Sequence, residues 1–97
     1  MLDKKDRYKL RSLSNRLRPV IIIGKDGLTE NIIISIKEVI RTHELIKIST
    51  LKTYSGPDHK ELAALLCTSI NAELIQIVGH VITLYKKNKE LNQYGIR

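Results

Sequence analysis

The sequence contains no phenylalanine and no tryptophan, and its four tyrosines are its only large aromatic side chains. Domains that read single-stranded nucleic acid by base stacking, such as the RRM and OB types, need clustered aromatics, so we expect neither type here. A single cysteine, Cys67, cannot form an internal disulfide. That cysteine usage is typical of the reducing cytoplasm, which is where we expect this chain to act.

Long apolar segments are also missing. The purely apolar runs are short, as at 20–23, whereas a membrane-spanning helix needs about 20 apolar residues. The first residues are charged rather than apolar, so we expect no signal peptide. The hydrophobic content of 42% is that of a globular protein. We therefore expect a single domain over 1–97, with its core at about 10–88 and a polar tail at 89–97.

Basic residues exceed acidic ones, and the excess lies at the two ends of the chain. The 17 Lys and Arg against 10 Asp and Glu give a net charge of +7. Residues 1–18 hold seven basic and two acidic side chains (net +5), residues 86–97 hold four and one (net +3), and residues 19–85 hold six and seven (net −1). This distribution indicates a polyanionic partner, nucleic acid first and an anionic membrane surface second. Solubility alone would also account for a charge of this size.

Residues 3–17 are predicted to form an amphipathic helix. Leu10, Leu13 and Leu17 recur at spacings of three and four, which gives one apolar stripe. At about 100° per residue, the basic side chains fall into two rows beside that stripe. The rows are Lys4, Arg7, Arg11 and Arg18, and Lys5, Lys9 and Arg16. We expect the stripe to dock on the core and both rows to face solvent.

The next segments alternate between strand and helix patterns. The apolar, β-branched run at 20–23 predicts a fully buried strand. Thr29 is a good N-cap, and the apolar spacing after it predicts a helix over 30–43. Alternating apolar and polar residues predict a strand over 44–51.

The second half of the chain repeats this alternation. Pro57 is well placed at the first position of a helix that runs to about Asn71. The apolar positions expected to face inward on it are Leu62, Leu65, Leu66 and Ile70. Strands over 74–78 and 81–85 follow, joined by a two-residue turn, and the tail from Lys86 is expected to fray. The predicted fold class is α+β: a helix followed by β-α-β-α-β-β, with a mixed four-stranded sheet flanked by helices.

A glycine-rich turn, Gly24-Lys25-Asp26-Gly27, separates the first predicted strand from the next helix. Glycines let the backbone turn tightly and approach a ligand without a Cβ in the way. The following helix offers free N–H groups and the positive end of its dipole, and Lys25 can add a charge to a phosphate contact. The loop is similar to the GXXG loop with which KH domains hold a nucleic-acid backbone. It is not a Walker or dinucleotide motif, and such turns often serve only to link a strand and a helix.

No catalytic or metal-binding constellation accompanies this loop. His43, His59 and His80 lie at a helix end, in a first helical turn and in a hairpin, without ligand spacing or a cysteine pair. Cys67 lies among apolar residues of a predicted helix and reads as a small buried side chain. We expect no enzyme, no metal and no cofactor. A small hydrolase that uses Cys67 and a histidine stays open as a minor alternative.

Three segments, in order, resemble the CRM domain (chloroplast RNA splicing and ribosome maturation), whose single-domain bacterial form is the YhbY type. The first is Leu17-Arg18-Pro19-Val20-Ile21-Ile22-Ile23-Gly24-Lys25-Asp26-Gly27-Leu28-Thr29. The second is His43-Glu44-Leu45-Ile46-Lys47-Ile48. The third is Ala72-Glu73-Leu74-Ile75-Gln76-Ile77-Val78-Gly79 with Val81 to Tyr85. The resemblance covers roughly residues 10–88, and one departure from it is the segment 51–59.

The resemblance implies a fold similar to the C-terminal domain of bacterial translation initiation factor three. It implies RNA binding through the GxxG loop and the adjoining basic surface, and association with precursors of the large ribosomal subunit. Gly24, Lys25, Asp26 and Gly27 carry over directly as the loop, whereas the N-terminal helix matches the family only in its basic character. We also expect RNA contacts from the seven cations Lys4, Lys5, Arg7, Lys9, Arg11, Arg16 and Arg18, and from Lys86 at the end of the last strand. We expect a cytoplasmic monomer without a small-molecule substrate. The alternative is a module that binds proteins or membrane surfaces through helix 3–17.

Overall fold

A computed structural model describes residues 2–96, so Met1 and Arg97, at the ends of the predicted domain, lie outside the described residues. The described part forms three helices and four strands. They are α1 (Lys4–Ser14), β1 (Pro19–Ile23), α2 (Glu30–His43), β2 (Leu45–Thr50), α3 (His59–Ile70), β3 (Glu73–Val78) and β4 (Val81–Tyr85). This is the predicted element order, and the α+β class is confirmed.

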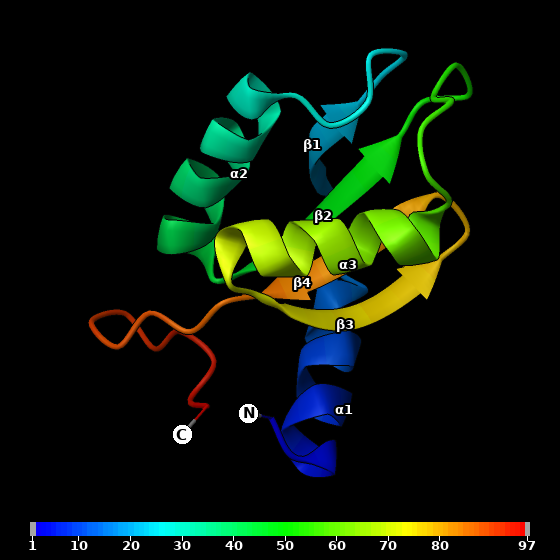
Figure 1. Cartoon of the computed structure of the whole chain (residues 1–97). Coiled ribbons are helices and arrows are strands. Elements are labelled where there is room, and N and C mark those ends of the chain that lie inside the picture. The colour runs from blue at the N-terminus through cyan, green and yellow to red at the C-terminus, as the bar shows by residue number, and fades with distance from the viewer. Residues whose placement is uncertain (1, 97) are drawn as a thin grey trace.

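The four strands form one mixed sheet in the order β1-β2-β4-β3. β1 runs parallel to β2, whereas β2 and β3 each pair antiparallel with β4. The two-residue turn between β3 and β4 lies at Gly79 and His80, as predicted. Figure 1 shows α2 and α3 together on one face of the sheet, and α1 extends from its lower end.

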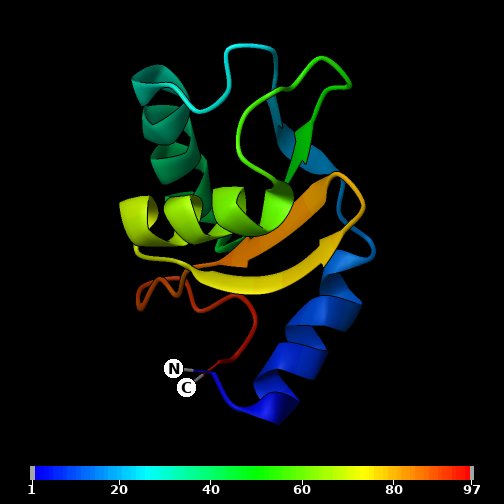
Figure 2. The ribbon, with the colours of Figure 1, turned by 45° about the vertical axis from the view of Figure 1, so that its right-hand side comes forward.

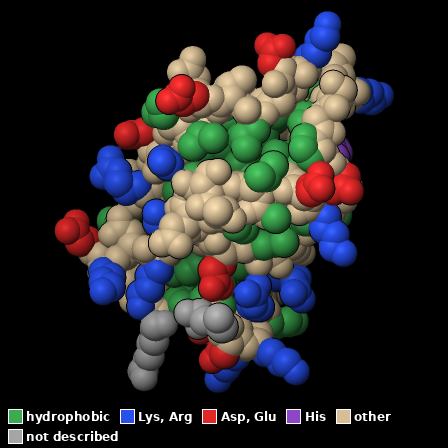
Figure 3. All heavy atoms as spheres, in the orientation of Figure 1, with side chains coloured by type: hydrophobic (Ala, Val, Ile, Leu, Met, Phe, Trp, Pro, Cys, Tyr) green, Lys and Arg blue, Asp and Glu red, His purple; other side chains and the backbone are tan. Residues whose placement is uncertain are grey.

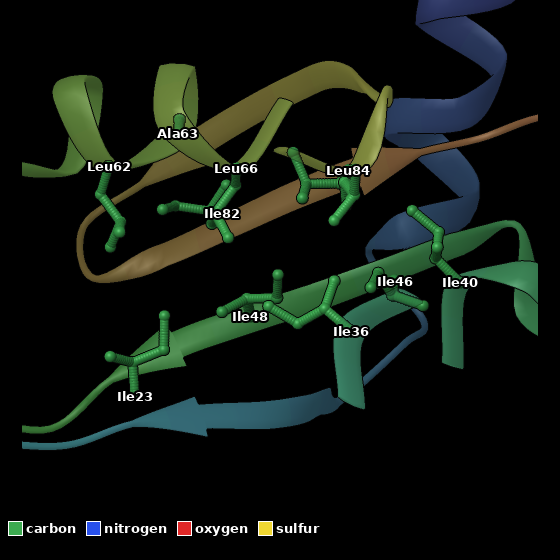
Figure 4. Close-up of a cluster of buried hydrophobic side chains, with 11 residues drawn as sticks. Ile23, Ile36, Ile40, Ile46, Ile48, Leu62, Ala63, Leu66, Ile82 and Leu84 are labelled. Carbon is green, nitrogen blue, oxygen red and sulfur yellow. The ribbon is translucent and has the colours of Figure 1, made fainter. Parts of the chain in front are cut away.

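The main hydrophobic core lies between the sheet and the two helices α2 and α3. Figure 4 shows Ile36 and Ile40 of α2 and Leu62 and Leu66 of α3 converging on inward-facing strand residues. The strand residues are Ile23, Ile46, Ile48, Ile82 and Leu84, all at most 1% exposed. The inward positions predicted on α3 are thus largely confirmed, but Leu65 is 47% exposed, because it faces away from the sheet on the outer side of α3.

A second, smaller core forms on the other side of the sheet, beneath α1. It joins Leu10 of α1 to Leu45, Ile75 and Tyr85 of the strands and to Ile96 near the C-terminus. Leu13 and Leu17 pack against it, so the predicted apolar stripe docks on the core. Because this leucine stripe is occupied within the protein, it is not free to insert into a membrane surface.

The expectation of a frayed polar tail after β4 is wrong. Ile96 is 1% exposed within the second core, and Lys9 Nζ donates a hydrogen bond of 2.6 Å to the carbonyl of Tyr94. Glu44, which is fully buried, accepts hydrogen bonds from the backbone N–H groups of Asn88 (2.8 Å) and Gln93 (2.7 Å). The tail is polar in composition, yet contacts with distant residues hold it in place.

β1 is not the fully buried strand that its apolar sequence predicts. Val20 is 48% exposed and Ile22 is 58% exposed, whereas Ile23 is completely buried. β1 is an edge strand of the sheet, and α1 packs against β2 and β3 instead of covering it. One face of β1 therefore lies open.

Two predicted helix boundaries shift. α3 begins at His59 rather than at Pro57, because Asp58 is the N-cap and its side chain accepts a hydrogen bond from the N–H of Glu61 (2.9 Å). α1 ends at Ser14, three residues before the predicted end. The remaining predicted boundaries agree with the structure to within one residue.

Candidate nucleic-acid interface

The loop between β1 and α2 has the tight turn that its two glycines predict. The N–H of Gly27 donates to the carbonyl of Gly24 at 3.0 Å, and Gly27 has a φ of 70°, a conformation that favours glycine. Lys25 and Asp26 are exposed at the tip of the turn. The loop stands out at one end of the molecule, beside the loop 51–58 (Figure 1).

The first turn of α2 follows directly and is capped as predicted. The side chain of Thr29 accepts a hydrogen bond from the N–H of Ile32 at 3.2 Å. The first N–H groups of any helix lack partners within the helix and carry the positive end of its dipole, which favours an anion there. Lys25 adds a positive charge, whereas the exposed carboxylates of Asp26 and Glu30 oppose an anion.

Gly27 itself is buried and cannot offer its backbone to a ligand. Its N–H is used in the turn, and a Cβ placed on it would lie 4.0 Å from Cε1 of Tyr54. Gly27 therefore serves the turn geometry. The backbone that is open to a phosphate belongs to Lys25 and Asp26.

The loop 51–58 packs against the GxxG loop, a contact that sequence reasoning missed. The N–H of Leu51 donates to the carbonyl of Ile23 at 2.9 Å, and a Cβ on Gly24 would lie 3.4 Å from Cδ1 of Leu51. The Tyr54 hydroxyl donates to the carbonyl of Pro57, which closes this second loop on itself. Burial, together with Asp58 and Glu61, raises the pKa of Tyr54, so its hydroxyl stays a donor. In the sequence, the available signal for this contact is a single tyrosine in a loop that contains Gly56-Pro57.

The structure places the GxxG loop and α1 at opposite ends of the molecule (Figures 1 and 2). The sequence led us to expect the glycine turn beside the cationic first helix, and that expectation is wrong. Leu10 packs in the second core and so holds α1 at one end of the molecule. β1 follows α1 in the chain and leads to the GxxG loop. The two features can therefore only contact separate parts of one ligand.

Three of the cations predicted to bind RNA are already engaged within the protein. Arg7 donates to the carbonyl of Leu74 at 2.7 Å and forms an ion pair of 3.5 Å with Glu73. Lys9 is bound to the carbonyl of Tyr94, and Lys86 Nζ donates at 2.9 Å to the carbonyl of Ile70, the last residue of α3. These side chains stabilise the fold, and their charges are less free to contact a ligand. The other predicted cations of the N-terminal region, all exposed, are Lys4, Lys5, Arg11, Arg16 and Arg18.

A second cationic surface lies between α2 and the segment that follows β4. We call this hollow, of about 480 Å³, the basic groove; it is lined by Lys37, Ile40, Arg41, Lys86, Lys87, Asn88 and Lys89. Figure 3 shows lysine and arginine side chains gathered along the left edge and the lower end of the visible face. Of these cations, the sequence analysis assigned only Lys86 to RNA binding. The spacing of Lys37 and Arg41 by four residues was a signal that they share one side of α2.

The surroundings of Cys67 do not favour its use as a nucleophile. Burial, and then the charge of Glu73, raises the pKa of the Cys67 thiol, which disfavours the thiolate that a nucleophile needs. Within residues 2–96, no three His, Cys, Asp or Glu side chains gather where they could hold a metal ion. Nor is any helix in that part of the chain long and apolar enough to cross a membrane.

A family comparison accounts for this combination of fold and loop. The model of the CRS1 / YhbY (CRM) domain matches residues 2–86, which is most of the chain. The chain belongs to the CRM family. The resemblance found in the sequence is therefore confirmed, and the GxxG loop and α2 lie inside the matched region.

Individual relatives match this chain over most of their length. The chain is 37% identical over 93 residues to the Bacillus subtilis protein named "Probable RNA-binding protein YqeI", and the match covers 96% of each chain. It is 29% identical to "Probable RNA-binding protein PA4753" of Pseudomonas aeruginosa, covering 95% of this chain and 88% of that one. The solution structure of SAV1595 from Staphylococcus aureus, 37% identical, superposes with a TM-score of 0.81 over 100% of this chain and 98% of that one.

Proposed function

We propose that this CRM protein binds RNA and acts without catalysis. The observation that carries the proposal is the exposed Lys25-Asp26 turn at the N-terminus of α2, a place where backbone N–H groups and the helix dipole favour a phosphate. The names of its relatives, which are called RNA-binding proteins, support RNA as the polyanion.

The contact works by charge and close approach. A phosphate sits against the turn and the first N–H groups of α2, and Lys25 neutralises it. Lys52, exposed on the neighbouring loop, neutralises a second phosphate. The exposed cations of the α1 end and of the basic groove contact more distant parts of the same RNA. Because these contacts are to phosphates, they give affinity rather than sequence preference.

The resemblance to single-domain bacterial CRM proteins supports a more specific role. In this proposal the RNA is ribosomal, and the protein acts as a cytoplasmic monomer on precursors of the large ribosomal subunit. Binding to one conformation of the RNA stabilises that conformation by mass action, without any covalent step. Crosslinking in cells, followed by sequencing of the attached RNA, tests this assignment. Enrichment of messenger RNA instead of ribosomal precursors would overturn it.

Salt dependence tests RNA binding itself. Five or six phosphate contacts to a single strand give a slope of log affinity against log salt of about −4, so doubling the salt weakens binding about 15-fold. A slope near zero contradicts the proposal. Lys25→Ala should lower affinity for every RNA sequence, whereas Lys60→Ala, which removes another exposed charge, on α3, should not. Equal losses in both variants would show that net charge, and not the loop, drives binding.

A further inference from the structure

A groove opens next to the loop 51–58. Leu51 and Tyr54 of that loop lie between the groove and the GxxG loop. The groove has a volume of about 460 Å³, and we call it the loop groove; it is lined by Thr50, Leu51, Lys52, Tyr54, His59 and His80. The lining comes from the end of β2, the loop 51–58, the start of α3 and the β3–β4 turn. Lys52, which is proposed above to neutralise a phosphate, is one of these lining residues, whereas no residue of the GxxG loop lines the groove.

Hydrogen bonds fix its floor. The N–H of Thr50 donates to the carbonyl of His80 at 3.1 Å, which ties the β3–β4 turn to β2. The Thr50 hydroxyl and His59 Nε2 are hydrogen-bonded at 2.7 Å. The rings of Tyr54 and His59 lie with their centroids 5.8 Å apart, tilted by 54°. The groove is thus preformed rather than assembled by a ligand.

The chemistry of the lining suits a flat group with polar edges. Leu51, 51% exposed, and the Tyr54 ring offer apolar surface. His80, exposed on its turn, and Lys52 offer polar groups at the rim, and none of the six described lining residues is a carboxylate. An unpaired nucleobase has this combination of an aromatic face, hydrogen-bonding edges and a phosphate attached nearby.

The GxxG loop and the loop groove share a wall. Leu51 lies against Gly24, and Tyr54 lies against Gly27, so both residues have one side toward the glycine turn and the other toward the groove. We infer that the loop groove takes one unpaired nucleobase of the RNA strand whose phosphate the GxxG loop holds. This inference rests on the proposed RNA binding and adds the place where base identity is read.

Two groove variants with matched controls test the inference. Leu51→Ala and His80→Ala remove exposed side chains of the groove. Leu65→Ala removes a leucine that is 47% exposed on the outside of α3, and His43→Ala removes an exposed histidine at the C-terminal end of α2. Circular dichroism confirms that each variant is folded.

The probes are single-stranded RNA octamers of uridine, adenosine or cytidine and an octamer of the same length that lacks bases. Fluorescence anisotropy gives the Kd of each pair. The wild type should bind its preferred base-bearing octamer about fivefold to tenfold more tightly than the abasic one, toward the lower end of what stacking contributes. The groove variants should bring this ratio close to one without weakening the abasic octamer, and the controls should leave the ratio unchanged.

The outcomes separate the two proposals. If the groove variants keep the wild-type ratio while Lys25→Ala weakens both kinds of octamer, the loop groove does not take a base and RNA binding at the GxxG loop stands. If the wild type binds neither kind of octamer in a salt-dependent way, RNA binding at this end fails and the base site fails with it. A uniform loss in the groove variants on both kinds of octamer also overturns the base site.

Discussion

The carboxylate of Glu44 accepts a hydrogen bond from the backbone N–H of Gln93, 49 residues later in the chain, at 2.7 Å. Its other oxygen accepts from the N–H of Asn88, and its own backbone carbonyl accepts from the N–H of Lys86. Glu44 also ends α2 with a φ of 63°, a conformation that side chains rarely adopt. This one residue therefore joins the end of α2 to the segment that closes the second core.

Glu44→Gln should loosen that segment. An amide keeps only one acceptor oxygen, so one of the two part-buried hydrogen bonds to Glu44 is lost, at a cost of about 2 kcal/mol in the free energy of unfolding. Urea denaturation measures the loss, and Glu90→Gln, an exposed carboxylate of the same segment, is the control. Equal midpoints for the two variants would contradict the proposed anchoring.

The two glycines of the GxxG loop should respond differently to alanine. Gly27 has a φ of 70°, so Gly27→Ala should cost about 1 to 2 kcal/mol. Gly24 is not in that region of φ, and a Cβ there would only reach ordinary contact with Leu51. Thermal unfolding should therefore show the larger decrease in Tm for Gly27→Ala. The reverse order would mean that the turn is not as described.

Asp26→Asn should strengthen RNA binding. Asp26 is exposed at the tip of the turn, where its negative charge repels a phosphate held by α2 and Lys25. Removing one exposed charge should raise affinity about twofold to fivefold at low salt, and the gain should shrink as salt screens the charges. Anisotropy titrations at two salt concentrations measure this. Weaker binding in the variant would show that the carboxylate itself contacts RNA.

Charge removal in the basic groove should reduce the salt dependence of binding to long RNA. Each phosphate contact contributes roughly 0.7 to the slope for a single strand, so the double variant Lys37→Ala, Lys87→Ala should flatten it by about 1.4. Both side chains are exposed, and the fold should be unaffected. Titrations across a range of salt concentrations give the slope. A slope equal to that of the wild type would remove the basic groove from the RNA path.

Tyr85→Phe should not destabilise the protein. Among the described residues, the Tyr85 hydroxyl is a buried polar atom without a hydrogen-bond partner, so its removal leaves no other group unpaired. Burial, and then the charge of Glu44, raises the pKa of Tyr85 to about 12. Because the folded state holds this proton more tightly than the unfolded chain, stability falls as the pH rises from 10 to 12. The phenylalanine variant should show a shallower alkaline decline in denaturant titrations, and an unchanged decline would contradict this cause.

Local patterns sufficed for the order of the elements. The cap at Thr29, the glycine turn and the alternation after Glu44 each act over a few residues, and each is found where predicted. The exposure of Val20 and Ile22 could not be read in this way, because it depends on β1 lying at the sheet edge. An apolar strand looks the same in sequence whether one of its faces is covered or both are.

The candidate site was predictable in its loop and not in its surroundings. Gly24 and Gly27 predict a turn from the sequence alone. The packing of Tyr54 over Gly27 could not be predicted in this way, because the two residues are 27 positions apart in the chain. The placement of α1 depends on which end of the sheet Leu10 packs against. Charge counts along the chain cannot show that Lys9 and Lys86 bind carbonyls of the protein itself.

The separation of the GxxG loop from α1 sets a minimum length for any strand that engages both. The molecule measures 37 Å along its longest axis, and a strand stacked as in a duplex advances about 3.4 Å per nucleotide, so a stacked strand that bridges the two ends has about eleven nucleotides. A stacked oligomer below that length occupies only one end at a time. Affinity should therefore rise in a step, rather than smoothly, once an RNA becomes long enough to be held twice.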